Sequence, residues 1–347
     1  IKGILGMQKG IPKIKINKGD YQVIVDKSVV KYRPFISCFA AKGKKVDDYL
    51  IKQLVQLQEK FCETYGRRRQ KVSIGLYSYS RLKFPVHYKA VNPLSVEFVP
   101  LEFKAKMNMK EILEEHPKGK EYAWILEGFE KYPLLTDDKN EVMSLVPVIN
   151  SDFTGKIEIG DENMFFEATG TDEEAVNLAA VIFAYALHER GFEIHSVEIK
   201  YPDRKKTSPD LGIETAAIKN EQIKRLFGLD LNENEVKHLL EKAQFELENH
   251  QVKIPPYRND ILHPYDIIED IGIMYGFDKI KESQLQTFTA GSILRINEFI
   301  DKIREIVVGI GYQEVMSPVL TNKDLLYKNM NIDDFGTIEI DDYMSET

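Results

Sequence analysis

The segment Thr169–Asp203 constrains the fold more than any other part of the chain. Thr171 and Glu174 have the spacing of a capping box, which predicts the start of a helix, and Gly191 predicts its end. The apolar run LAAVIFAYAL at Leu178–Leu187 is too short to cross a bilayer and is typical of a core helix. The following FEIHSVEIKY predicts a strand. A helix followed by a strand is therefore the clearest local unit in the chain.

Strand-like runs surround this unit. They are YQVIVD, RPFISCFAA, KVSIGLYSY, VHYKAV and SVEFVPL. One further helix is predicted, because KKVDDYLIKQLVQLQEKFCETYG carries an apolar stripe from Val46 to Phe61 and ends at Gly66. The helices and strands do not alternate strictly, which predicts an α+β domain over residues 19–203. The polar segment Pro202–Gly212 is interpreted as a domain boundary.

The second half of the chain has a different pattern. KNEQIKRLFGLD and NENEVKHLLEKAQ have helical periodicity, FELENHQVKIP is strand-like, and a helix is predicted from about Tyr265 to Tyr275. SILRINEFIDKIREIVVGIGYQEVMSPVLT then predicts a helix, a break at Gly311 and a strand of a new domain. The chain is therefore predicted to be an α+β multidomain protein.

Composition and charge limit the function classes. The 347 residues carry a net charge of −8, which disfavours a surface coated with basic residues but leaves room for a local basic groove. Two cysteines, Cys38 and Cys62, cannot form a disulfide framework, so a reducing, cytoplasmic setting is expected. The sequence shows no signal peptide, and it begins with Ile1 in a way that suggests a piece of a longer protein.

Four carboxylates form the most distinctive polar group. Asp260, Asp266, Glu269 and Asp270 lie just before and inside the helix predicted from Tyr265. Such hard oxygen ligands suit Mg²⁺. Acidic residues in a first helical turn are also favoured by capping and by the helix dipole, without any metal. The spacing alone leaves both interpretations open.

The same stretch carries a resemblance to a known family. PPYRNDI, followed by YDIIEDIGIMYGFDKI, resembles the small metal-binding, winged-helix-related domain in the β subunit of phenylalanyl-tRNA synthetase. The shared pattern is P-x-x-R-x-D-I, then D-x-x-E-[ED], closing on Y-G-[YF]-[DN]-x-I. The resemblance implies that Asp260, Asp266, Glu269 and Asp270 bind Mg²⁺ near a contact with the α subunit.

The resemblance covers nearly the whole chain. LVQLQEKFCETYGRRRQKVSIGLYSYS, YPLLTDDKNEVMSLVPVINSDFTGKI and GYQEVMSPVLTNK each resemble β subunits of the archaeal and eukaryotic type. It implies that residues 1–18 end an N-terminal domain and residues 19–203 form an editing domain. Residues 207–283 would then form the metal-binding domain, and residues 290–347 would start a class II synthetase-like module without aminoacylation chemistry. The family's sequences begin earlier and continue past Thr347.

The resemblance also implies a function. The α subunit uses ATP to attach phenylalanine to tRNA(Phe), in a heterotetramer of two α and two β subunits, and no membrane is involved. The β subunit binds tRNA and hydrolyses mischarged tyrosyl-tRNA(Phe). Such editing is useful because a pocket that accepts phenylalanine by apolar contact rejects tyrosine poorly. The alternative is a non-catalytic RNA-binding or scaffolding relative that has lost editing.

Site residues follow from the same resemblance. Leu135, Ser144 and Glu167 match the editing pocket, where Glu167 would either bind the tyrosine hydroxyl or orient the attacking water. The structural alternatives are a core leucine, a serine satisfied by backbone, and a glutamate of an edge strand that faces water. Arg67, Arg68 and Arg69 in GRRRQK are the predicted RNA-binding residues, since arginine suits phosphate. A solvated loop is the alternative for them.

Overall fold

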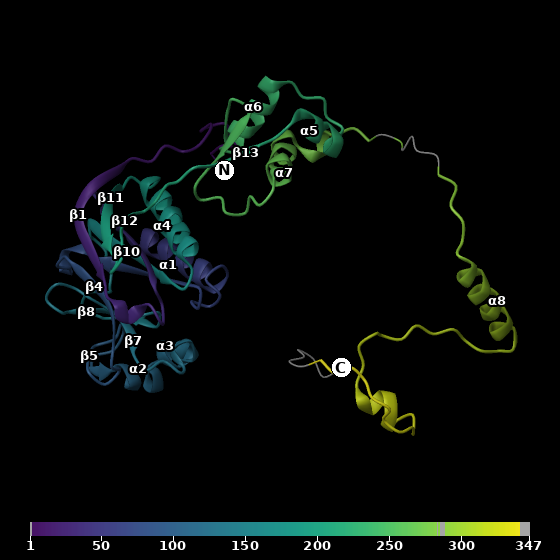
Figure 1. The fold of residues 1–347 in the computed structure, drawn as a ribbon, viewed down its shortest axis with the longest axis horizontal. Helices are drawn as coiled ribbons and strands as arrows, with labels where there is room; N and C mark the ends of the chain where they lie inside the picture. The colour runs from purple at the N-terminus through teal and green to yellow at the C-terminus, as the bar shows by residue number, and fades with distance from the viewer. Residues whose placement is uncertain (1, 283, 285–288, 341–347) are drawn as a thin grey trace. The chain divides into compact units, whose positions relative to one another are not determined.

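The structure of the chain is a computed structural model that describes residues 2–282, 284 and 289–340. The chain divides into two compact units, residues 1–281 and residues 282–347 (Figure 1). The larger unit contains a large sheet with its helices and a smaller three-stranded sheet with helices of its own. The fold is therefore mixed α and β, as predicted.

The large sheet has ten strands and joins distant parts of the sequence. Its order is β3-β10-β2-β11-β1-β4-β7-β8-β9, with β12 beside β11. β1 runs parallel to β11 and β4, and the other neighbours are antiparallel. The strands are β1 Ile16–Val25, β2 Phe35–Lys42, β3 Val72–Ser78, β4 Val86–Val91, β7 Tyr132–Thr136, β8 Val142–Leu145, β9 Ile149–Asn150, β10 Asn163–Gly170, β11 Glu193–Lys200 and β12 Lys205–Ser208.

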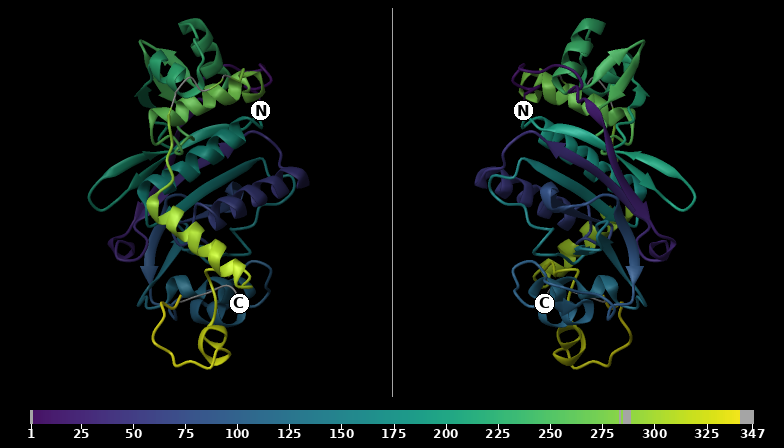
Figure 2. Two further views of the ribbon diagram at one scale, coloured as in Figure 1. Left: turned by 90° about the vertical axis from the view of Figure 1, so that its right-hand side faces the viewer. Right: turned by 90° about the vertical axis from the view of Figure 1, so that its left-hand side faces the viewer.

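Two long helices cover one face of this sheet. α1 (Asp48–Glu63) and α4 (Glu173–His188) pack on β2, β3 and β10 and enclose a core that includes Phe39, Phe166 and Phe183 (Figures 1 and 2). The run predicted to be a core helix is α4, most of which is buried, so that prediction is confirmed. Burying each large apolar side chain contributes about 1.5–3 kcal/mol.

The start of α4 differs from the prediction by one residue. Asp172, and not Thr171, is the N-cap, and its carboxylate accepts a hydrogen bond from the N–H of Ala175 at 2.9 Å. The backbone N–H of Thr171 donates instead to the carbonyl of Lys71 at 3.1 Å. Thr171 is thus still tied to the end of the sheet, which delays the helix.

A helical subdomain packs against β7 and β8. It consists of β5 (Glu97–Phe98), β6 (Met107–Asn108), α2 (Met109–Glu115) and α3 (Pro117–Tyr122). The predicted strand SVEFVPL shortens to the two residues of β5, because prolines cannot donate to a strand ladder and Pro100 follows closely. α2 and α3 were not predicted. The capping box of Asn108 and Glu111 was the available signal for α2.

The first half of Pro202–Gly212 is part of the large sheet and not the predicted domain boundary. Lys205–Ser208 form β12, which pairs antiparallel with β11. Arg204 and Lys206 form ion pairs with Glu173 at 2.7 and 3.0 Å, and these contacts bring the strand back along the sheet. The sheet thus extends to Ser208, five residues beyond the predicted limit at residue 203.

The smaller sheet agrees with the prediction in part, because the run FELENHQVKIP forms two of its strands, whereas the strand at Glu214–Ala217 was not predicted. Its strands β13 (Glu214–Ala217), β14 (Glu246–Glu248) and β15 (Gln251–Ile254) have the order β13-β15-β14. The helices α5 (Asn220–Phe227), α6 (Glu233–Lys242) and α7 (Pro264–Tyr275) complete its core, which includes Leu240, Phe245 and Ile271. A Cβ on Gly272 would lie 2.6 Å from the ring of Phe227, so α7 and α5 pack closely there.

The first residues contact this smaller group. The N–H of Gly10 donates to the carbonyl of Glu241 at 2.9 Å, and Gly3 lies against the carbonyl of Lys242. Residues 16–18, predicted to end a separate domain, already belong to β1.

Residues 282–347 hold α8 (Arg295–Gly309) and a short helical turn at Asp324–Lys328. The described residues after Gly311 contain no strand, so the strand predicted in YQEVMSPVLT is wrong within residues 289–340. A strand needs a partner for its backbone groups, and this unit supplies none among those residues. Residue 283 of the predicted metal-binding domain and residues 341–347 of the predicted last module lie outside the described residues.

Short 3₁₀ turns complete the description, at Lys27–Val29, Tyr79–Arg81, Ala123–Leu126 and Phe277–Lys279. None of the helices described in residues 2–282, 284 and 289–340 combines the length and apolar character that crossing a membrane requires.

Candidate functional site

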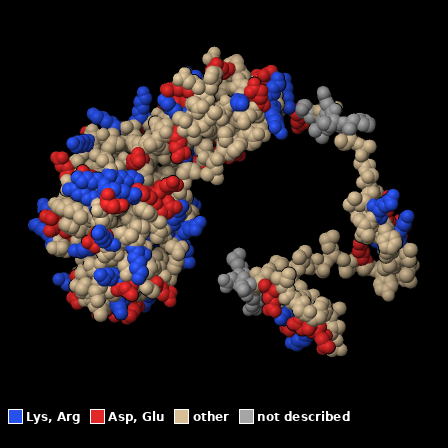
Figure 3. All heavy atoms as spheres, viewed as in Figure 1, with Lys and Arg blue, Asp and Glu red and all other residues tan. Residues whose placement is uncertain are grey.

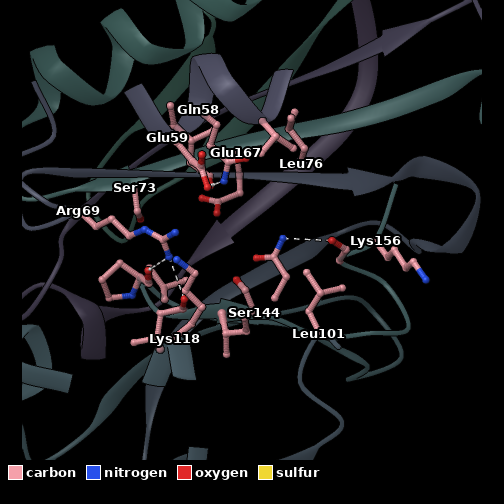
Figure 4. Close-up of a pocket in the computed structure, with 18 of the residues that line it drawn as sticks. Gln58, Glu59, Arg69, Ser73, Leu76, Leu101, Lys118, Ser144, Lys156 and Glu167 are labelled. Atoms are coloured by element: carbon pink, nitrogen blue, oxygen red, sulfur yellow. Dashed lines mark hydrogen bonds between the residues drawn. The ribbon is translucent and has the colours of Figure 1, made fainter. Parts of the chain in front are cut away.

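A cavity of about 350 Å³ lies between α1, β3, β10 and the β8–β9 region. Part of its wall is apolar, contributed by Ile51, Leu54, Val55, Leu76, Ile149 and Ile157. Polar side chains line the remainder, including Gln58, Arg69, Lys118, Ser144, Asn150 and Glu167 (Figure 4). A cavity with apolar walls and a few polar groups is the usual form of a small-ligand site.

Glu167 is the most unusual group in this cavity. It lies on β10 between Cys38 of β2 and Gly75 of β3, and its side chain is only 3% exposed. Oε1 is 3.1 Å from the Tyr77 hydroxyl, whereas Oε2 has no hydrogen-bond partner among the described residues. The interpretation of a water-facing edge strand is wrong, because β10 has a neighbour on each side.

Burial raises the pKa of Glu167 from its ordinary 4.5 to about 8, and the Tyr77 hydrogen bond and the Arg33 charge oppose that rise. A buried carboxylate loses hydration, so the neutral acid is favoured. At neutral pH the group is therefore mainly a carboxylic acid, which can both donate and accept a hydrogen bond.

Ser144 lies beside the same group. It is on β8, 3% exposed, and its Oγ is 3.0 Å from the Tyr77 hydroxyl. Its partner is thus a side chain that also contacts Glu167, and not backbone. In the structure, the predicted residues Ser144 and Glu167 both contact the Tyr77 hydroxyl.

Leu135 has a different position. It pairs in register with Ser144, but it is fully buried in a core cluster with Tyr88, Met143 and Phe165. It does not line the cavity. For this residue the structure shows the core position, beside Ser144 on the neighbouring strand and outside the cavity wall.

The sequence pattern missed Arg33. This side chain is 2% exposed, and it donates to the carbonyls of Thr169 and Gln70 at 2.7 and 2.9 Å and to Ser73 Oγ at 3.1 Å. Its partners Ser73 and Thr169 lie on the same face of β3 and β10 as Glu167, and its charge lowers the pKa of that carboxyl. No local pattern around Arg33 signals such burial.

The three predicted RNA-binding arginines lie in different environments. All three have left-handed backbone, with φ of 50°, 51° and 67° at Arg67, Arg68 and Arg69. Arg69 lines the cavity, donates to the carbonyl of Val148 at 2.9 Å, and lies 4.0 Å from the centre of the Tyr122 ring. Arg67 and Arg68 are exposed. On the face shown in Figure 3, basic and acidic side chains are interspersed.

The four carboxylates predicted to bind metal also have different partners and do not point to one common position. Arg258 donates to Asp260 from Nε and Nη2, at 2.8 and 2.7 Å, and from Nη2 to Asp270 at 2.8 Å. Asp266 caps α7, accepting from the N–H groups of Leu262 and His263 at 2.7 Å each. Glu269 is exposed.

This arrangement does not fit a metal ion. The positive charge between Asp260 and Asp270 is the guanidinium of Arg258, and Asp266 already has the capping role that needs no metal. Across the residues that the structure describes, no three His, Cys, Asp or Glu side chains gather as a metal-holding group. We call Arg258, Asp260 and Asp270 the arginine clamp.

The clamp makes a testable contribution to stability. Replacing Arg258 by methionine is expected to cost about 1–3 kcal/mol at pH 7, because Asp270 is only 16% exposed and loses its partner. Hydrogen bonding to Arg258 lowers the pKa of Asp260. The stabilisation that this ion pair contributes is therefore present above pH ~4, and it is lost as the pH falls through the lowered pKa of Asp260.

Thermal unfolding at pH 7 and pH 3 checks this expectation. The difference in unfolding temperature between the parent and Arg258→Met should be smaller at pH 3 than at pH 7. The exposed-residue control Arg225→Met should unfold at the same temperature as the parent at both pH values. A gap of constant size would show that packing, and not the ion pairs, accounts for the effect.

Comparisons with known proteins show which family the chain belongs to. Residues 216–277 match the tRNA synthetase B5 domain. The chain is 39% identical over 350 residues to a phenylalanine–tRNA ligase beta subunit of Pyrococcus horikoshii, covering 100% of this chain and 63% of that protein. It is 40% identical over 347 residues to the corresponding subunit of Thermococcus onnurineus, covering 99% of this chain and 60% of that protein. The chain thus spans somewhat less than two thirds of these relatives.

A solved structure is also similar. It is the N-terminal fragment of the phenylalanyl-tRNA synthetase beta subunit from Pyrococcus horikoshii, with a TM-score of 0.76 and 39% identity. The match covers 79% of this chain and 80% of that fragment. With this identity over most of both chains, the protein belongs to the family of phenylalanyl-tRNA synthetase beta subunits.

Proposed function

We propose that this chain edits mischarged tRNA within a phenylalanine–tRNA ligase, by hydrolysing the ester between tyrosine and the terminal adenosine of tRNA(Phe). One observation carries the proposal. A buried glutamic acid, Glu167, lines a cavity of about 350 Å³, and its Oε2 has no hydrogen-bond partner among the described residues. That volume suits an aromatic amino acid, and the free oxygen suits a phenolic hydroxyl.

The Glu167 carboxyl selects tyrosine over phenylalanine in this proposal. Tyrosine pairs its hydroxyl with Glu167, while phenylalanine would cover the same oxygen without pairing it. Leaving a buried polar group unpaired costs about 1–3 kcal/mol, which is a preference of about fivefold to more than a hundredfold. With the pKa of Glu167 raised to about 8, the group is a weak base at neutral pH. Binding the hydroxyl is therefore its proposed role, in preference to activating water.

Hydrolysis itself needs little from the protein. Water adds to the ester carbonyl carbon, the bond from that carbon to the ribose oxygen breaks, and the ribose oxygen takes up a proton. The developing negative charge is stabilised by positive or hydrogen-bonding groups. Arg69 and Lys118 line the cavity and supply positive charge there.

The partners are proposed from the family. Relatives are named as beta subunits of phenylalanine–tRNA ligase, so an α subunit that uses ATP, in an assembly of two α and two β subunits, is the proposed partner. The exposed Arg67 and Arg68 are proposed to contact tRNA phosphates. Cys38 and Cys62 are free and buried, which accords with the proposed cytoplasmic setting.

Magnesium at the acidic residues is proposed only from the family resemblance. An ion held by Asp260, Asp266, Glu269 and Asp270 would have to take two carboxylates from Arg258, so the arrangement shown does not support it. Titration of the two-subunit enzyme with MgCl₂ decides the question. The second candidate function, a scaffold that has lost editing, is disfavoured by the buried pair of Ser144 and Glu167.

The test of editing is tyrosine release from tyrosyl-tRNA(Phe) by the complete two-subunit enzyme. The parent is expected to release tyrosine faster than phenylalanine. Glu167→Ala should slow tyrosine release by about tenfold to a hundredfold and leave phenylalanine charging intact, because charging belongs to the α subunit. Glu97→Gln, an exposed glutamate on β5, is the control. A parent that releases neither amino acid would support the scaffold instead.

A further inference from the structure

Tyr77 contacts residues of the cavity wall and joins the two predicted polar residues. It is on β3, fully buried, and is not part of the cavity wall. Its hydroxyl is 3.0 Å from Ser144 Oγ, 3.1 Å from Glu167 Oε1 and 3.5 Å from Asn150 Oδ1. One hydroxyl therefore connects three cavity residues from three different strands, β8, β10 and β9.

A glycine makes this contact possible. Gly75 is paired with Glu167 across β3 and β10, and it lies two residues before Tyr77, on the same face of the strand. A Cβ on Gly75 would be 2.5 Å from the Tyr77 hydroxyl oxygen and 2.6 Å from Glu167 Oε1. The space in which tyrosine and glutamate meet is thus the space that a side chain at Gly75 would fill. Glycine in a strand interior commonly marks such a close approach.

The Tyr77 hydroxyl can donate a hydrogen bond to only one of its neighbours at a time. It has one proton to donate and can accept further hydrogen bonds. Burial raises the pKa of Tyr77 well above 10.0, so the proton stays on the phenol. Its ring packs near Phe165, 6.3 Å between centroids, which limits where the hydroxyl can go.

We propose that Tyr77 is a positioning residue, which engages Oε1 of Glu167 so that Oε2 alone is left for the bound amino acid. This proposal rests on the proposed editing function and names how the specificity-determining oxygen is selected. Without the Tyr77 hydroxyl, the two oxygens of Glu167 become equivalent and the ionised form loses a donor. The protonation of Glu167 should respond accordingly.

Other groups around Glu167 must be held constant in the test. Arg33 supplies positive charge on the same face of β10, where it contacts Thr169, and Cys38 faces Glu167 from β2. The remaining titratable or charged neighbours lie on α1, on β4 and in the cavity wall: Cys62, Tyr88, Glu59, Arg69, Glu102, Lys118 and Lys156. Substituting Tyr77 by phenylalanine leaves all of them in place.

The experiment is a pH titration of the Glu167 carboxyl by ¹³C NMR in the 347-residue chain with labelled glutamate. The signal is assigned by its loss in Glu167→Gln. Tyr77→Phe should move the Glu167 midpoint to higher pH by about one unit, because a donor to the carboxylate is lost. Gly75→Ala should move it in the same direction while the phenol is retained. Tyr122→Phe, which removes a buried hydroxyl that donates to Glu63 at 2.8 Å, is the control and should leave it unchanged.

The outcomes separate this inference from the editing proposal. An unchanged Glu167 midpoint in Tyr77→Phe would overturn the positioning role, whether or not the two-subunit enzyme edits. In an active enzyme, Tyr77→Phe should reduce the preference for tyrosyl-tRNA over phenylalanyl-tRNA by about threefold to tenfold. Loss of rate without loss of preference would contradict it. If the parent does not edit, the midpoint still tests the contact.

Discussion

Replacing Glu167 by glutamine should make the chain more stable than the parent above pH 8 and leave the two nearly equal at pH 5. The reason is the difference in protonation between folded and unfolded chains. Burial raises the pKa of Glu167 to about 8 in the fold, whereas an unfolded glutamate titrates near pH ~4.3. Between these values the folded chain binds the extra proton, so its stability falls as pH rises.

The effect is large because each pKa unit corresponds to about 1.4 kcal/mol. A group whose pKa rises by three to four units on folding costs on the order of 5 kcal/mol once it is ionised in the fold. Glutamine has a similar shape and never ionises, so it removes this loss. Above pH 8 the free energy of unfolding should therefore favour the variant by about 4 kcal/mol more than it does at pH 5.

Unfolding midpoints at pH 5, 7 and 9 test this prediction. The curves of parent and Glu167→Gln should separate progressively as the pH rises. The exposed-residue variant Glu97→Gln should follow the parent throughout. Curves that stay parallel from pH 5 to pH 9 would mean that Glu167 is already ionised in the folded chain.

Replacing Arg33 by methionine should lower the stability of the large sheet by about 3–5 kcal/mol, because each buried acceptor left unpaired costs about 1–3 kcal/mol. The guanidinium is buried and satisfies the carbonyls of Gln70 and Thr169 and the hydroxyl of Ser73. Methionine fills a similar volume but donates nothing, so these buried acceptors lose their partner. The backbone of Arg33 is itself held, since the Tyr88 hydroxyl donates to its carbonyl at 2.7 Å.

Two comparisons sharpen this prediction. Arg33→Lys keeps the charge but loses the planar fork, and should recover only part of the stability. Arg225→Met, on the exposed face of α5, should stay within about 0.5 kcal/mol of the parent. Urea unfolding of the three variants measures the differences. Equal stability of Arg33→Met and the parent would show that water satisfies the acceptors equally well.

Local structure was largely readable in the sequence. The periodicity of Asp48–Glu63 and Glu173–His188 predicted both long helices, and the pattern of Pro264–Tyr275 predicted α7. These elements depend on residues three or four positions apart, which a sequence displays directly. The family was readable for a related reason, because the motif from Pro255 to Ile280 keeps its spacing within one short stretch.

Pairing between distant strands could not be read in that way. β12 looked like a polar linker, because its residues acquire their partners only when β11 lies beside them. Arg258 looked like part of a metal motif, and only the fold shows its guanidinium between Asp260 and Asp270.

The sequence by itself predicted the longer helices, several strands and the family, and the resemblance singled out Ser144 and Glu167. Only the tertiary structure decided how those two side chains work together. Tyr77 is 67 residues from Ser144 and 90 from Glu167, and Arg33 is 136 residues from Thr169. Hydrogen bonds over such separations follow from the order of strands in the sheet. That order is set by the packing of the whole core, and no local pattern encodes it.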